Sequence, residues 1–285
     1  MEDIILTKTS DFSLIFELIR KNYLMANVDV SNFKYFFPRD ILMLVQYFVI
    51  QNSSGIDGKL LLGKGNGWYI YSINMVEFCN TNYDIPNHVL QSSPTAIPIK
   101  RVDTSTMNEY ILDAQAFFRN YCPGKDISAL NICISEIINN VYDHSRSKSD
   151  AYIFSQFYKT KRQIRFAISD LGVGIVNSVN NYMIINGEED LSDFDALTWA
   201  FKKGQSVKSK KYNMGVGFEN ILKNLLGVGE VHLFTGNLYC YISLLGKMRM
   251  SINPIQHFIG TLIEIVIYTE KLEKIDETVL EDYIF

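Results

Sequence analysis

Three polar side chains in the middle of the sequence are spaced so that a helix would carry them on one face. Glu136, Asn140 and Asp143 stand at positions i, i+4 and i+7, and such residues project from a shared side of a helix. An amide oxygen can bind a magnesium ion while a carboxylate one turn away orients a water for reaction. Solvated helix faces carry the same spacing, so the triplet permits this chemistry without requiring it.

A second motif follows an apolar run that we predict to be a strand. It consists of Asp170, Gly172 and Gly174 within the segment Asp-Leu-Gly-Val-Gly. Glycines at a strand end let the backbone come close to a ligand, and a carboxylate there can accept a hydrogen bond from an exocyclic amine such as that of adenine. Glycine also marks tight turns for steric reasons, so both interpretations stay open for this motif alone.

Two further glycine motifs lie later in the chain. Gly215 and Gly217 precede a predicted helix, whose free N–H groups and positive dipole end favour a phosphate. Gly260 and Thr261 open the last predicted strand, where the hydroxyl could bind a ligand beside Asp170. A turn that begins a strand is the alternative meaning of this last pair.

These motifs need helices and strands to hold them, and the apolar residues predict where those lie. Ile134, Ile137 and Ile138 follow one buried helical stripe, so we expect a helix over about 127–142. The other expected strands and helices are strands 96–102, 151–158, 163–169, 231–234, 239–244 and 261–268, and helices 105–121, 196–203 and 218–226. Because late hairpins accompany mixed helices and strands, we predict an α/β fold, an α+β sandwich with a mixed sheet.

The first part of the chain predicts a separate small α/β module over residues 1–95. We expect residues 1–34 to be helical, a second helix to begin at Pro38 and end near residues 52–55, and strands at 59–62 and 68–73. The polar stretch 80–95 is the expected linker. We therefore place a boundary near residue 95, a second domain over 96–270 and a tail over 271–285.

Taken together and in this order, the four motifs resemble those of the GHKL ATPases, the family named for gyrase, a heat-shock chaperone, histidine kinases and mismatch-repair proteins. The family's N box looks like Ser135 to Asp143, its first glycine box like Asp170 to Gly174, and its second like Gly215 to Gly217. The resemblance covers about 96–270. It implies a Bergerat-type fold, in which a mixed β-sheet carries helices on one face and ATP is held between them.

The resemblance also implies a role for each matching residue. Asn140 would coordinate Mg²⁺, Glu136 would position or activate the attacking group, and Asp170 would read the adenine amine with support from Thr261. A loop that contains Ser206 and Lys208 looks like the family's ATP lid, where an ammonium attracts phosphate oxygens; a solvated loop is the alternative. The full set implied to bind the nucleotide is Asn140, Asp143, Asp170, Gly172, Gly174, Ser206, Lys208, Gly215, Gly217 and Thr261.

Two positions depart from the family's pattern without removing a ligand. Val141 stands where a small residue often follows the N-box asparagine, and Phe218 stands where leucine often follows the second glycine box. A phenylalanine like Phe218 is similar to what the anti-sigma-factor serine kinases show. The N-terminal module looks like a reduced STAS-type fold, the fold of the partners of those kinases.

The histidines argue against a self-phosphorylating histidine kinase. His88, His144, His232 and His257 are the only ones, and none is followed by the acid-then-proline pattern of a phosphoacceptor helix. We therefore expect an ATP-binding regulatory protein, a serine/threonine kinase or slow ATPase that acts on a protein partner. The alternatives are a nucleotide-sensing module without turnover and a histidine-kinase-like protein that lacks its own phosphoacceptor domain.

Composition narrows the classes of partner. The 285 residues carry a net charge of -4, which argues against nucleic acid and anionic membrane because both favour clustered positive charge. The 4 cysteines form no closely spaced pair, so we expect reduced thiols and neither a zinc site nor disulfides. The longest apolar stretch, 41–50, is too short to span a bilayer. We predict a cytoplasmic protein and leave a homodimer open.

Overall fold

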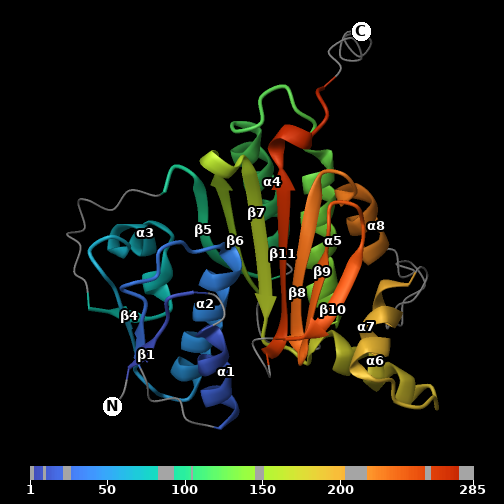
Figure 1. Cartoon of the computed structure of the whole chain (residues 1–285), viewed down its shortest axis with the longest axis horizontal. Helices are drawn as coiled ribbons and strands as arrows, with labels where there is room; N and C mark the ends of the chain where they lie inside the picture. The colour runs from blue at the N-terminus through green and yellow to red at the C-terminus, as the bar shows by residue number, and fades with distance from the viewer. Residues whose placement is uncertain are drawn as a thin grey trace.

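The computed structural model describes residues 3–8, 11–21, 27–82, 93–103, 105–144, 151–202, 217–253 and 258–275. These residues form a mixed α/β structure with two sheets, one of four strands in the order β1-β2-β3-β4 and one of seven in the order β10-β9-β8-β11-β7-β6-β5 (Figure 1). Within the described ranges, no helix has both the length and the apolar character that crossing a membrane needs.

The larger sheet is antiparallel at every pairing. Its strands are β5 (Ala96–Val102), β6 (Ala151–Tyr158), β7 (Gln163–Asp170), β8 (Gly229–Gly236), β9 (Leu238–Ile242), β10 (Met248–Ile252) and β11 (Phe258–Tyr268). The prediction of a mixed sheet is therefore wrong for this sheet. β7 and β8 run in the same direction, but β11 enters between them and runs against both, so no parallel pair forms.

Five helices cover one face of this sheet. They are α4 (Met107–Arg119), α5 (Ser128–His144), α6 (Gly174–Ile185), α7 (Asp193–Phe201) and α8 (Gly217–Leu225). Alternate residues of β11, Ile263, Ile265 and Ile267, share a buried cluster with Ile134 and Ile137 of α5. This packing confirms the apolar stripe that predicted α5, while α6 was not predicted.

In the part of the N-terminal module that the structure describes, a parallel sheet is accompanied by three α-helices and a 3-10 helix at Met75–Glu77. Its elements are β1 (Ile4–Ile5), α1 (Phe12–Arg20), β2 (Val28–Asp29), α2 (Pro38–Ser53), β3 (Lys59–Leu61), α3 (Gly67–Ser72) and β4 (Asn80–Thr81). The helix that begins at Pro38 is confirmed, whereas the prediction of one helical segment over 1–34 is wrong because two strands flank α1. The strand predicted at 68–73 is also wrong, since a short apolar run can equally form a helix.

Helix α2 joins the module to the other face of the large sheet. Every residue over 41–48 is buried, as expected of a helix that is apolar on nearly all sides. Ile41 and Leu44 of α2 share one buried cluster with Phe154, Ala167 and Leu262 of the large sheet. Helices thus cover both faces of the sheet. The described helices within 96–270, α4 to α8, lie on one face, as predicted, and α2 of the N-terminal module covers the other. The boundary near residue 95 stays a prediction.

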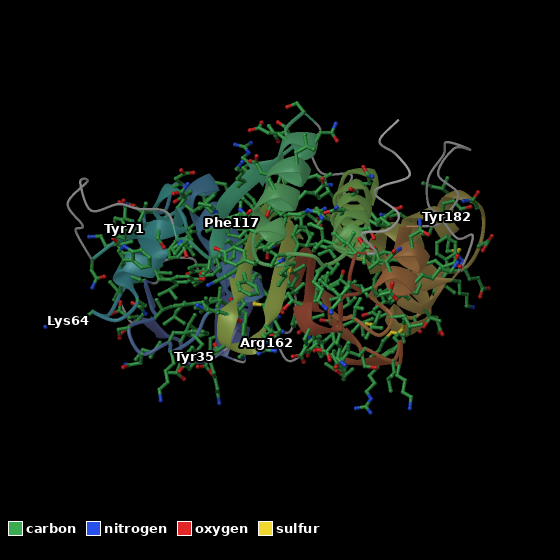
Figure 2. The ribbon with its side chains drawn as sticks, turned by 90° about the horizontal axis from the view of Figure 1, so that it is seen from above. Tyr35, Lys64, Tyr71, Phe117, Arg162 and Tyr182 are labelled. Carbon is green, nitrogen blue, oxygen red and sulfur yellow. The ribbon has the colours of Figure 1, made fainter. Side chains whose placement is uncertain are left out.

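The view from above shows the N-terminal module at one end of the molecule and helix α6 at the other (Figure 2). Lys64 and Tyr71 mark the N-terminal module, and Tyr182 of α6 marks the far end (Figure 2). The seven-stranded sheet lies between them, with α2 on one face and α4 to α8 on the other.

Candidate functional site

Asp170 is the last residue of strand β7, which ends at the lower edge of the sheet in Figure 1. Its Oδ1 accepts a hydrogen bond of 2.6 Å from the backbone N–H of Gly172, and the backbone N–H of Thr261, its cross-strand partner, also donates to the carboxyl. The residue is 2% exposed. Burial raises the pKa of Asp170 to about 7, against the two backbone hydrogen bonds, which lower it. Its side chain lies on the α5 face, because Ile168, two residues earlier, packs there.

Two glycines near Asp170, Gly174 and Gly260, have positive φ angles, a backbone conformation that favours glycine. Gly174 begins α6 at φ 77°, and a Cβ there would lie 2.8 Å from the Thr235 hydroxyl. That hydroxyl accepts from the Ile175 N–H at 3.1 Å and donates to the Gly260 carbonyl at 3.2 Å. Gly260, at φ 72°, lies against the Asp170 carbonyl. The ends of β7, β8 and β11 and the start of α6 are therefore tied together at one point.

The side chain of Glu136, on α5, is partly buried and contacts helix α8. The side-chain amide of Asn220 donates to Glu136 Oε1 at 3.1 Å, and both groups are partly buried. Asn220 lies three residues after Gly217, which begins α8. The bond therefore links the predicted N-box helix to the helix that follows the second glycine motif.

Several predicted site residues lie outside what the structure describes. Asn140 and Asp143 belong to the backbone of α5, but the positions of their side chains are outside the described part of the chain. Ser206, Lys208 and Gly215 are likewise outside it. The residues at either side of this segment are described: the rings of Phe201 and Phe218 pack with centroids 4.7 Å apart. Helices α7 and α8, on either side of residues 203–216 in the sequence, thus contact each other through these two rings.

A pocket of about 570 Å³ borders the first glycine motif. It is lined by Gly172 and Val173, by residues of α6 and the start of α7, by the end of β8 and the turn after it, and by the beginning of β11. Neither Glu136 nor Asp170 lines it. Among the described residues, no group of three or more His, Cys, Asp or Glu side chains could hold a metal ion, and Asn140 is not a residue of those types.

Sequence reasoning missed three residues that contact this site. Asn220 was visible beside the second glycine motif, but nothing in the spacing pairs it with Glu136. Thr235 lies inside a strand and carries no local signal. Gln46, on α2, donates its amide Nε2 hydrogen to the Asp170 carbonyl at 2.7 Å across 124 residues of sequence.

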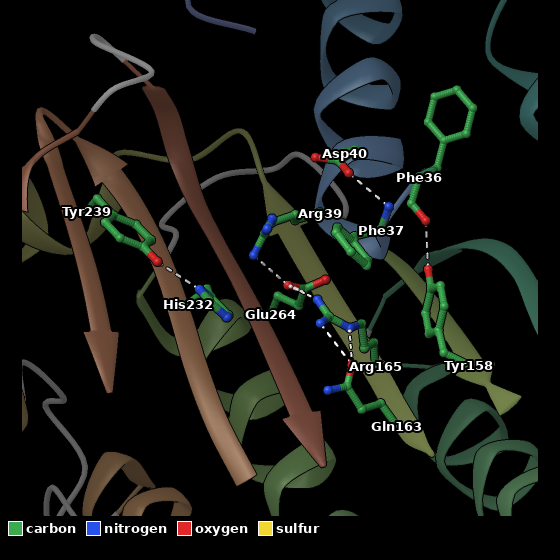
Figure 3. A network of polar contacts seen from close by, with 10 residues as sticks. All are labelled: Phe36, Phe37, Arg39, Asp40, Tyr158, Gln163, Arg165, His232, Tyr239 and Glu264. Carbon is green, nitrogen blue, oxygen red and sulfur yellow. Dashed lines mark hydrogen bonds and ion pairs between the residues drawn. The ribbon is translucent and has the colours of Figure 1, made fainter. Parts of the chain in front are cut away.

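A buried charge network joins α2 to strands β7 and β11. Arg39 of α2 and Arg165 of β7 both bind Glu264 Oε2 of β11, at 3.0 and 3.3 Å, and Glu264 is fully buried (Figure 3). His232 Nδ1 lies 2.8 Å from the Tyr239 hydroxyl nearby. Burial, then the charges of the two arginines, lower the pKa of His232 to about 3. The histidine is therefore neutral near pH 7.

No protein-family model matches the chain, and neither does any curated protein. Among solved structures, the chain is similar to the B-subunit of the DNA gyrase from Myxococcus xanthus, with 9% identity and a TM-score of 0.25. The match covers 61% of this chain and 48% of the gyrase subunit, so the chain spans about half the length of that protein. A likeness of this size leaves the function to be argued from the residues themselves.

Proposed function

We propose that this chain is an ATP-binding regulatory protein of the GHKL type that takes its nucleotide with Mg²⁺. The observation that carries the proposal is the buried carboxyl of Asp170, held at a strand end by the backbone N–H groups of Gly172 and Thr261. A buried carboxyl is costly unless it is bonded or used. An acceptor fixed in this way suits the exocyclic amine of adenine.

The other motifs supply the groups that a triphosphate needs. Asn140 is the proposed magnesium ligand, and Asp143, three residues later in the sequence of α5, is proposed to contact the nucleotide with it. Gly217 begins α8 and Gly215 precedes it in the sequence; both are proposed to bind phosphate oxygens, because helix N-termini present free N–H groups. Ser206 and Lys208 are proposed to contact the phosphates from the intervening segment.

Glu136 favours chemistry on the bound nucleotide, as protein kinase or slow ATPase activity directed at a protein partner. A carboxylate near the reacting phosphate can orient or accept a proton from the attacking group. One of its oxygens accepts from Asn220, which orients the carboxylate and also withdraws part of its basicity. That hydrogen bond favours the second candidate, a module that senses ATP without turnover.

Calorimetric titration with MgATP tests the binding site. We expect Asp170→Asn and Asn140→Ala to lose most of the affinity, and undiminished binding by both variants would refute the site. Release of inorganic phosphate then separates the two candidates. Under the catalytic candidate, Glu136→Ala keeps MgATP binding and loses turnover; a wild-type protein that binds MgATP and releases no phosphate, alone or with protein substrates, is the sensing module.

A further inference from the structure

The side chain of Gln46 reaches the candidate site from the face of the sheet opposite the proposed nucleotide. It stands on α2 of the N-terminal module and is fully buried. Its Nε2 donates to the backbone carbonyl of Asp170 at 2.7 Å. The module therefore contacts the main chain of the residue whose carboxyl is proposed to read adenine.

That carbonyl controls the geometry of the first glycine motif. It belongs to the peptide group between Asp170 and Leu171, and Gly172, one residue further on, donates its N–H to Asp170 Oδ1 at 2.6 Å. Rotation of this peptide group would displace the Gly172 N–H and release the carboxyl. A hydrogen bond that holds the carbonyl thus also holds the carboxyl in its orientation.

The surroundings of Gln46 argue against a purely stabilising role. Its neighbours along α2, Leu44, Val45 and Tyr47, are all fully buried. Its Oε1 is buried and has no hydrogen-bond partner among the described residues. A buried polar atom without a partner lowers stability, and an apolar side chain of similar size would avoid that cost. A polar residue at this point is better explained by the group that it binds.

We infer that Gln46 is a positioning residue of the nucleotide site, and that helix α2 forms the back of that site. This inference rests on the proposed binding of ATP. It makes the N-terminal module part of the machinery that selects adenine, because a displacement of α2 would move the Asp170 carboxyl.

The test compares MgATP with MgITP, whose base carries a carbonyl where adenine has its exocyclic amine. In Gln46→Met the carbonyl of Asp170 loses its donor, and we expect MgATP to bind about three- to tenfold more weakly, the value of one hydrogen bond. The affinity for MgITP should change little, so the ratio of the two affinities falls. A general loss of structure would weaken the binding of both nucleotides to the same degree, so the ratio of the two affinities would not change.

Gln51→Met is the matched control, because Gln51 is also a fully buried glutamine of α2 and its amide donates to Tyr47 within the module at 3.0 Å. We expect it to leave the ratio unchanged. Gln46→Asn, which keeps an amide but shortens the side chain, should also lower the ratio and serves if the methionine variant does not fold.

The two levels of the proposal fail in different ways. If the wild-type protein binds MgATP and both Gln46 variants keep its ATP-to-ITP ratio, the role of Gln46 is refuted while the proposed function stands. If the wild-type protein does not bind MgATP, the proposed function is refuted, and the inference with it.

Discussion

Replacement of Asp170 by asparagine should change how the stability of the protein depends on pH. Burial raises the pKa of this carboxyl from 3.8 to about 7 in the folded protein. The folded state therefore holds the proton more tightly than the unfolded state, and stability falls as pH rises from about 4 to about 7. At 1.36 kcal/mol per pKa unit, the wild-type protein should lose about 3 kcal/mol from this group between about pH 5 and about pH 8.

Urea unfolding at several pH values measures this term as a difference between two proteins. Asparagine keeps an acceptor oxygen for Gly172 but does not titrate. The free energy of unfolding of the wild type minus that of Asp170→Asn should therefore fall by about 3 kcal/mol between about pH 5 and about pH 8. Subtraction removes the contributions of all other titrating groups, His232 included. Asp113→Asn is the control, because Asp113 is a partly exposed partner of Lys100 and such pairs contribute little. Parallel profiles for the wild type and Asp170→Asn would refute the reasoning.

Three further predictions follow from the contacts at the site and on the opposite face. Asn220→Ala removes the hydrogen bond that orients the Glu136 carboxylate. Under the catalytic candidate the lost orientation outweighs the gain in basicity, so the rate of phosphate release should fall about tenfold or more with little change in MgATP affinity. An unchanged or higher rate would show that this bond does not support turnover. Arg39→Met leaves Arg165 as the remaining ion-pair partner of buried Glu264, so the free energy of unfolding in urea should fall by about 3 kcal/mol. A decrease below about 1 kcal/mol would mean that water reaches the carboxylate. His232→Gln removes a group whose pKa is lowered from 6.5 to about 3 in the folded protein. Because the wild type loses stability from this group as pH falls below about 6.5, the variant should unfold at lower pH in an acid titration. Coincident acid midpoints would contradict the burial of a neutral histidine.

Local patterns predicted most elements from residue 96 onward, because period and length agreed there. α5 followed from its isoleucine stripe, and the strands from their apolar runs between turns, except β10, whose sequence Met-Arg-Met-Ser-Ile was not predicted as a strand. α6 was missed because Val, Asn, Ser and Ile dominate its sequence and none of them favours a helix strongly; packing against α7 and the sheet decides its conformation. The segment 68–73 was misassigned because six apolar and aromatic residues fit either period.

The candidate site divides in the same way. Residues within a motif, such as Asp170 and Gly174, could be named because type and spacing carry the chemistry. Their partners could not, because the contacts depend on topology. Asn220 meets Glu136 only because α8 packs on α5, and Gln46 meets Asp170 only because α2 lies on the far face of the sheet. The antiparallel sheet was likewise hidden, since no local signal says between which strands β11 enters.

The central position of β11 also sets the order in which the chain can fold during synthesis. It is the fourth of seven strands across the sheet, yet the last of them in the sequence. Until it leaves the ribosome, β7 and β8 both expose bare edges, and unpaired edges of this kind promote aggregation. Thr261, the cross-strand partner of Asp170, arrives on the same strand. A nascent chain that ends before Phe258 therefore lacks both the central strand of the sheet and part of the lining of the pocket.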